Sequence, residues 1–105
     1  MASTTVAPPS LAPLHILLFI AGEEHHSRAA RANLAQLQER YFSDNSRIEV
    51  VNVLDDYRKA LEWRVVLTPT LLVVSPLPVV RIIGTLDDTS HVLEVLQSKA
   101  EVAPS

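Results

Sequence analysis

The sequence predicts an α/β domain whose mixed four-stranded sheet carries helices on both faces. Short apolar runs of strand length alternate with amphipathic helical segments, and a proline-rich turn joins the last two strands. The chain has 105 residues, which is enough for one hydrophobic core. Its 48% apolar and 20% charged residues are those of an ordinary globular domain.

The first strand and the first helix follow an N-terminal segment rich in proline. Residues 1–13 contain no Lys, Arg, Asp or Glu and no periodic apolar face, so we expect a disordered tail there. The run HILLFIAG at 15–22 is nearly continuous apolar sequence, which is typical of a strand covered on both faces. Apolar residues then recur at helical spacing. We therefore expect a helix over 27–42, with Ser27 as its N-cap.

The second strand and the second helix are shorter. Residues 47–53, RIEVVNV, alternate and are rich in β-branched side chains, as a strand should be. Asp55 or Asp56 can then cap a second helix. The side chains that we expect on its apolar side are Tyr57, Leu61 and Val65.

The C-terminal half begins with TPTLLVV at 68–74, a strand introduced by a Thr-Pro bond. Only residues 75–77 separate it from the next proline and the strand VVRII at 79–83, so these two strands should form an antiparallel hairpin. After a turn, a last helix should bury Val92, Val95 and Leu96. The resulting order, βαβαββα, is the thioredoxin-like topology, in which that Thr-Pro bond is usually cis.

Composition excludes several kinds of chemistry. The chain contains no cysteine, so thiolate metal sites, cysteine nucleophiles and redox pairs are absent. A net charge of -3 and a pI near 5.7 argue against a basic surface that would bind nucleic acid. Two glycines cannot form a glycine-rich phosphate loop, and no serine has nucleophile-elbow glycines. We therefore expect no catalytic residue and no cofactor.

The loop after the first strand has the sequence Glu23, Glu24, His25, His26. Adjacent histidines rarely converge on one metal ion, and acidic residues before a helix are already favoured by its dipole, so we expect no metal here. Ser27 could serve as a hydroxyl donor in a cysteine-free glutathione-transferase type of enzyme, which remains an alternative although no second, helical domain completes its substrate pocket.

The expected location is the cytoplasm. The apolar stretch at 14–21 is too short to cross a bilayer. The first Lys or Arg is Arg28, so the N-terminus lacks the positive segment of a secretory signal.

Residues 68–84 carry the most specific pattern. TPTL is followed at fixed distance by PLPV, RIIG and an acidic turn, and this arrangement resembles the KaiB family of circadian clock proteins. FIAG at 19–22 and VVNVL at 50–54 are similar to the family's YVAG and VIDVL. The resemblance continues in register from about residue 15 to residue 93. It implies a KaiB/thioredoxin-like domain over 14–100 with a flexible C-terminus at 101–105.

The resemblance also implies a function. KaiB proteins are non-enzymatic clock regulators that bind the hexameric ATPase KaiC and modulate its phosphorylation cycle, recruiting KaiA or competing with SasA and engaging CikA-type histidine kinases. An alternative within the family is a stress or signalling adaptor for a different KaiC-like protein or histidine kinase. The family is metamorphic: the partner-binding monomer has the order given above, whereas a resting tetramer has the order βαββααβ. A tetramer or dimer of this chain is therefore also expected.

Candidate partner contacts come from the first helix, the second strand and the second helix. Tyr57 and Trp63 are large amphipathic groups of the interface type. Clock-type members usually carry a lysine at the position of Glu49 and an arginine at that of Val80, so we expect a weaker basic surface and an altered partner choice. The candidate contacts are Ser27, Arg28, Arg47, Glu49, Tyr57, Trp63, Arg64 and Arg81. The candidate cis-proline or fold-switch positions are Pro69, Pro76, Pro78 and Gly84.

Overall fold

The computed structural model describes residues 13–42 and 46–101 and has the predicted order βαβαββα. The expected tail at 1–13 and C-terminus at 101–105 lie outside the described residues except for Pro13 and Glu101, the last residue of the final helix. The elements are β1 His15–Ile20, α1 His25–Tyr41, β2 Arg47–Asn52, α2 Tyr57–Glu62, β3 Thr70–Ser75, β4 Val80–Ile83 and α3 Thr89–Glu101. None of these helices is long and apolar enough to span a bilayer.

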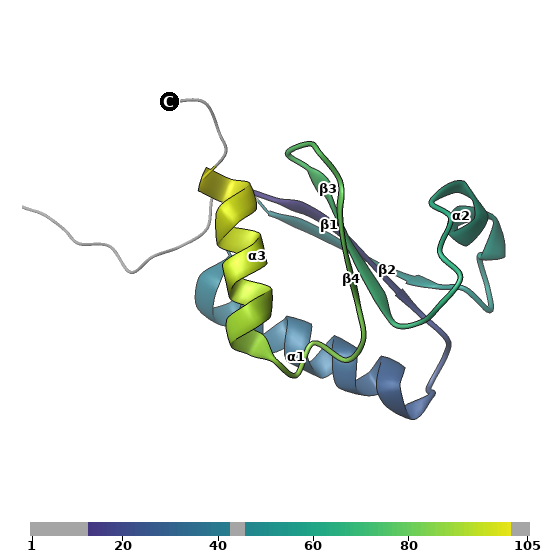
Figure 1. The fold of residues 1–105 in the computed structure, drawn as a ribbon. Coiled ribbons are helices and arrows are strands. Elements are labelled where there is room, and N and C mark those ends of the chain that lie inside the picture. Colours follow the sequence, from purple (N-terminus) through teal and green to yellow (C-terminus); the bar gives the residue numbers. More distant parts are fainter. Residues whose placement is uncertain (1–12, 43–45, 102–105) are drawn as a thin grey trace, which may run out of the picture.

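The four strands form one mixed sheet with the spatial order β2-β1-β3-β4 (Figure 1). Strand β1 pairs in parallel with β2 and antiparallel with β3, and β3 pairs antiparallel with β4, so the predicted hairpin is confirmed. Because β1 is paired on both sides and covered on both faces, residues 16–20 are all buried. This is the thioredoxin-like arrangement, and not the alternative order βαββααβ.

Helices cover both faces of the sheet, as predicted. One face packs beneath α1 and α3, which lie together in Figure 1, away from α2. Its buried side chains include Ile16, Leu18, Ala30, Leu34, Leu71, Val92 and Leu96. The opposite face forms a smaller cluster of Leu17, Phe19, Val51, Ala60, Val65 and Leu72, which we call the α2-side core. Because successive side chains of β1 point to opposite faces of the sheet, β1 contributes residues to both cores.

Helix α1 begins two residues earlier than predicted. Both carboxylate oxygens of Glu24 accept backbone N–H groups, from His26 at 3.0 Å and from Ser27 at 3.1 Å, so Glu24 is the N-cap. The prediction that Ser27 caps this helix is wrong. Ser27 is completely buried, and its hydroxyl accepts the backbone N–H of Ala21 at 2.9 Å. The earlier start turns Ser27 inward, where it links the end of β1 to α1.

Helix α2 is capped by Asp56, whose side chain accepts the backbone N–H of Lys59, as one of the two predicted alternatives required. Its apolar side was predicted wrongly, because Tyr57 and Leu61 are exposed. The helix has only six residues, and the chain then turns. The contacts with the sheet therefore come from Ala60, on an adjacent side of the helix, and from Val65, beyond its end.

The Thr68-Pro69 bond is cis, as expected, and the bonds before Pro76 and Pro78 are cis as well. Gly84 has a positive φ of 117°, and its N–H donates to the carbonyl of Pro69, which closes the end of the β3–β4 ladder. A role for these four positions in fold switching stays a prediction.

Candidate functional site

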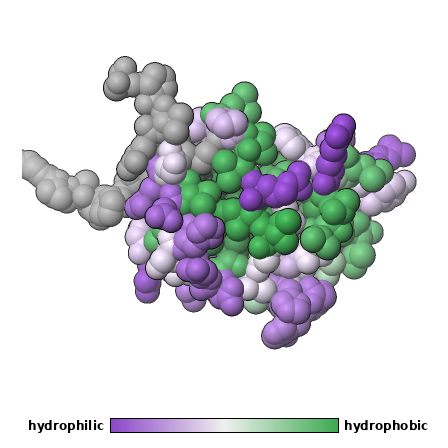
Figure 2. Space-filling model, viewed as in Figure 1, coloured by the Kyte–Doolittle hydropathy of each residue, from purple (hydrophilic) through white to green (hydrophobic). Residues whose placement is uncertain are grey.

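An exposed apolar surface surrounds α2. Val66 is 89% exposed, and four further large apolar side chains within residues 54–67 are more than half exposed. We call this set the α2 surface: Leu54, Tyr57, Leu61, Val66 and Leu67. Figure 2 shows apolar side chains gathered over β4 and around the loop between α2 and β3, with hydrophilic side chains among them. Groups of exposed large apolar side chains rimmed by polar ones are typical of surfaces that bind proteins, membranes or ligands.

The turn that ends α2 places part of this surface. The N–H of Arg64 donates to the carbonyl of Leu61 at 3.1 Å, and the N–H of Val65 donates to that of Ala60 at 2.8 Å. These two bonds form a Schellman motif, in which Val65 packs back against Ala60 in the α2-side core. Beyond this turn the chain leaves the core, so Val66 is exposed.

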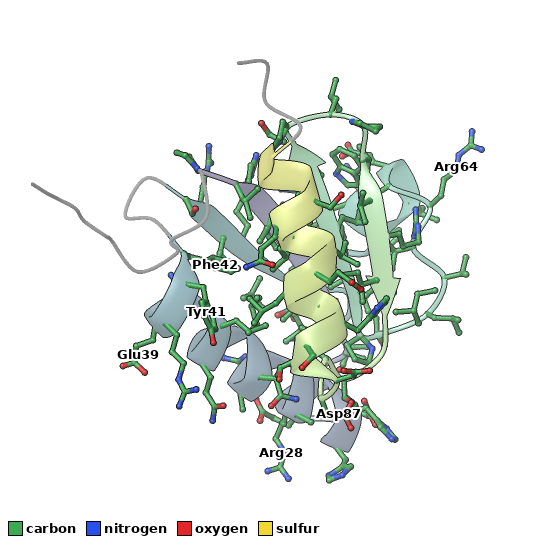
Figure 3. All side chains as sticks on the ribbon, turned by 60° about the vertical axis from the view of Figure 1, so that its left-hand side comes forward. Arg28, Glu39, Tyr41, Phe42, Arg64 and Asp87 are labelled. Carbon is green, nitrogen blue, oxygen red and sulfur yellow. The ribbon has the colours of Figure 1, made fainter. Side chains whose placement is uncertain are left out.

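Arg64 occupies the position of this motif that usually carries glycine, with a φ of 56°. Its backbone takes part in the turn, and its side chain projects away from the domain (Figure 3). The predicted partner contact Arg64 is therefore presented to solvent beside the α2 surface.

Arg81, another predicted contact, reaches the same turn from β4. Its guanidinium donates to the carbonyl of Trp63 at 2.9 Å and to that of Arg64 at 3.4 Å. Trp63 is half-buried and packs against the α2-side core. Tyr57, Trp63, Arg64 and Arg81 are thus brought together around α2.

Glu49 lies among a histidine, a lysine and an arginine of its own chain. Its carboxylate lies 2.8 Å from the ring Nε2 of His15, 3.2 Å from Nζ of Lys59 and 3.5 Å from the guanidinium of Arg47. The hydrogen bond with His15, followed by that with Lys59, holds the pKa of Glu49 below its usual value of 4.5. The negative charge of Glu49 is therefore paired with two cations of its own chain, Arg47 and Lys59, the second of which comes from α2.

The remaining predicted contacts do not join this group. Ser27 is buried, so its side chain does not reach the surface of this structure. Arg28 is exposed on α1, and Figure 3 shows it pointing away from the domain far from Arg64. The sequence reasoning missed Leu54, Val66 and Leu67. The sequence did contain a signal for Val66 and Leu67. These two apolar residues directly precede Thr68-Pro69 and do not continue the helical spacing of apolar residues, so they were candidates for exposure.

Residues 23–26, predicted from the sequence to form a loop, contain the N-cap Glu24 and the first two residues of α1. The carboxylate of Glu24 lies 2.9 Å from Nδ1 of His26 in addition to its two backbone bonds. Across residues 13–42 and 46–101, no group of three or more His, Asp or Glu side chains could hold a metal ion. The backbone N–H of His26 is the largest cause, and its side chain the second, that lowers the pKa of Glu24 to about 2.

This cap predicts a specific acid response. Because the pKa of Glu24 falls from 4.5 to about 2 on folding, its contribution to stability is complete above pH 4.5 and is lost as the pH falls toward 2. We expect the difference in free energy of unfolding between wild type and Glu24→Gln to be largest above that range and to shrink within it. Urea unfolding at a series of pH values measures this difference. Glu23→Gln is the control, since Glu23 accepts no backbone hydrogen bond, and a pH-independent difference for Glu24→Gln would contradict the prediction.

Residues 17–98 match the family model of the KaiB domain. The chain is 34% identical to the circadian clock protein KaiB3 of Synechocystis sp. and 40% identical to the circadian clock oscillator protein KaiB of Synechococcus elongatus. Each match spans 76 residues, 72% of this chain and 74% of the relative.

Two solved structures share the fold. A chain in a structure describing thiol resolution in yeast mitochondrial 1-Cys peroxiredoxin has a TM-score of 0.68 at 18% identity, over 82% of this chain and 78% of that one. The N-terminal domain of SasA from Synechococcus elongatus has a TM-score of 0.55 at 24% identity, over 91% and 93%. At these identities the likeness is one of fold, and it confirms the thioredoxin-like class.

Proposed function

The chain belongs to the KaiB family, and we propose that it is a non-enzymatic circadian clock regulator that binds a KaiC-type hexameric ATPase through the α2 surface. The observation that carries the proposal is the exposed apolar surface at residues 54–67. It lies beside Arg64, on a domain whose family relatives are clock proteins.

The composition of this surface suits a protein partner. Exposed apolar side chains such as Leu61 and Val66 can form the desolvated centre of an interface. Tyr57 and Arg64, at its edge, are of the residue types that most often dominate binding energy. The partner surface that complements them is apolar at its centre and carries an acidic group opposite Arg64.

The geometry favours binding over the enzymatic alternative. A glutathione-type enzyme needs an accessible hydroxyl at the start of the first helix. Ser27 is completely buried there, and its hydroxyl already accepts the N–H of Ala21. The side chains that define the α2 surface are large and apolar, with Arg64 beside them, and this composition suits binding.

Family membership supplies the proposed mechanism. Bound to the ATPase, the chain would modulate the phosphorylation cycle by recruiting a KaiA-type protein or by competing with SasA- or CikA-type histidine kinases. The adaptor alternative uses the same surface toward a different KaiC-like protein or a histidine kinase. Partner identity, and not the surface, separates the two functions.

Size-exclusion chromatography with light scattering tests the proposal. The pure chain is run alone, which gives its oligomeric state, and then mixed with each KaiC-type ATPase of its host in ATP or ADP. We expect it to comigrate with one hexamer, and a SasA-type domain to displace it. If no KaiC-type protein forms a complex, the proposal fails and the adaptor function takes its place. Saturable glutathione binding would instead favour the enzyme.

A further inference from the structure

We infer that Arg81 is a positioning residue that caps the C-terminus of α2 from β4 and holds the turn at Arg64 in the shape that presents the α2 surface. The role assigned to that surface rests on the proposed function. The cap itself depends only on contacts within this chain.

Helix α2 needs such support because it is short. A helix of six residues is unstable on its own, and its last carbonyl groups have no partner inside the helix. The Schellman bonds satisfy the carbonyls of Ala60 and Leu61. Two carbonyls that follow in the turn, those of Trp63 and Arg64, both accept from Arg81.

The charge of Arg81 adds to these hydrogen bonds. A cation at the C-terminus of a helix is favoured by the helix dipole, and hydrogen bonds from a charged donor are stronger than neutral ones. Helix α2 carries Lys59 in its last turn, but the Nζ of Lys59 donates to Glu49. Arg81 is therefore the cation placed on the carbonyls at this helix end.

The turn also has a local conflict that a clamp would offset. Arg64 has a φ of 56°, a left-handed conformation that only glycine adopts without steric penalty. A glycine would make the turn easier to form but would remove the outward guanidinium seen in Figure 3. The arginine at this position thus makes the turn less stable than a glycine would, but it places a charged group beside the α2 surface. Such locally unfavourable residues occur at functional sites.

Two roles for Arg81 make different kinetic predictions. A rim charge that meets an acidic partner directly mainly accelerates association and makes it depend on salt. A positioning residue that stabilises the bound shape mainly slows dissociation. In this structure the guanidinium of Arg81 is engaged with two backbone carbonyls of its own chain, which favours the second role.

The first test uses the pure chain. Amide hydrogen exchange at Arg64 and Val65, measured by NMR, reports the Schellman bonds directly. We expect Arg81→Ala to accelerate exchange at these two amides about tenfold, with β1 amides unchanged. Arg58→Ala, which removes an exposed arginine of α2 itself, is the matched control. Unchanged exchange in Arg81→Ala would overturn the inference.

A second background sharpens this test. In Arg64→Gly the turn forms without strain, so a further Arg81→Ala should accelerate the exchange of Val65 less than it does in wild type. Equal acceleration in both backgrounds would show that Arg81 does not act on the turn. Arg81→Lys, which keeps the charge but cannot donate from two separate nitrogens, should fall between wild type and Arg81→Ala.

Binding kinetics then connect the cap to the partner. We expect Arg81→Ala to raise the dissociation rate of the KaiC-type complex about tenfold and to keep the salt dependence of association. Arg64→Gln should instead slow association and reduce its salt dependence. If Arg81→Ala behaves like Arg64→Gln, Arg81 is a direct contact and the inference is overturned. If wild type binds no KaiC-type ATPase, the proposed function fails while the exchange experiment still decides the cap.

Discussion

Replacing Val66 by aspartate is expected to weaken binding to a KaiC-type ATPase about a hundredfold, equivalent to about 2.7 kcal/mol. Val66 is 89% exposed in the free chain, so no packing is lost on substitution. In a complex formed through the α2 surface, the new carboxylate would be buried without a partner among apolar groups, and that desolvation is unfavourable. Titration by fluorescence anisotropy with a labelled chain measures the affinity.

The matched control for this prediction is Leu77→Asp. Leu77 is also a strongly exposed apolar residue, but it lies in the β3–β4 hairpin, at the opposite end of β3 from the loop that carries Val66. The free energy of unfolding of both variants should lie within about 0.5 kcal/mol of the wild-type value, as is usual for surface substitutions. Equal affinities of the two variants for the ATPase would place the interface elsewhere on the domain.

Phe19→Ala is expected to reduce the free energy of unfolding by about 3–5 kcal/mol. Phe19 has no exposed surface and occupies the α2-side core together with Ala60 and Val65. Truncation removes apolar contacts and leaves a cavity beneath α2, and the loss is a large part of the roughly 5–15 kcal/mol that stabilises a small domain. Guanidinium unfolding followed by the fluorescence of Trp63, the single tryptophan, measures it.

Leu61→Ala is the comparison that makes this prediction specific. From the sequence alone Leu61 belonged to the core, whereas in the structure it is exposed on α2. Its truncation should change the free energy of unfolding by no more than about 0.5 kcal/mol. If Leu61→Ala reduced the free energy of unfolding nearly as much as Phe19→Ala, the side of α2 that carries Leu61 would have to pack against the sheet.

The order of the elements, the mixed sheet and the family were all available from the sequence. They depend on signals that lie close together along the chain: continuous apolar residues in β1, alternation in β2, and a short, proline-rich connection between β3 and β4. Short connections and the pairing of a continuous apolar strand on both sides leave few arrangements of such elements. The same signals could not show which of two locally plausible caps or helix faces the chain uses.

The N-terminus of α1 and the orientation of α2 are such details. Glu24 and Ser27 are both plausible caps. The N–H of Ala21 donates to the hydroxyl of Ser27, so the backbone N–H groups at the start of α1 are left to Glu24. In α2, six residues are too few for apolar periodicity to define a face. Packing against the sheet buries Ala60 and Val65, whereas Leu61 is exposed to solvent.

The candidate site shows the same division between local and tertiary information. The sequence identified Tyr57, Trp63, Arg64 and Arg81 as separate interface candidates, because their residue types suit binding. It could not show that Arg81 donates to the carbonyls of the α2 turn, since these groups are 17 and 18 positions apart on different elements. That contact exists only because the sheet places β4 beside the end of α2. The sequence by itself therefore determined which elements form and which family they belong to, whereas the tertiary structure decided which side chains meet, because contacts between distant elements depend on packing that no local pattern encodes.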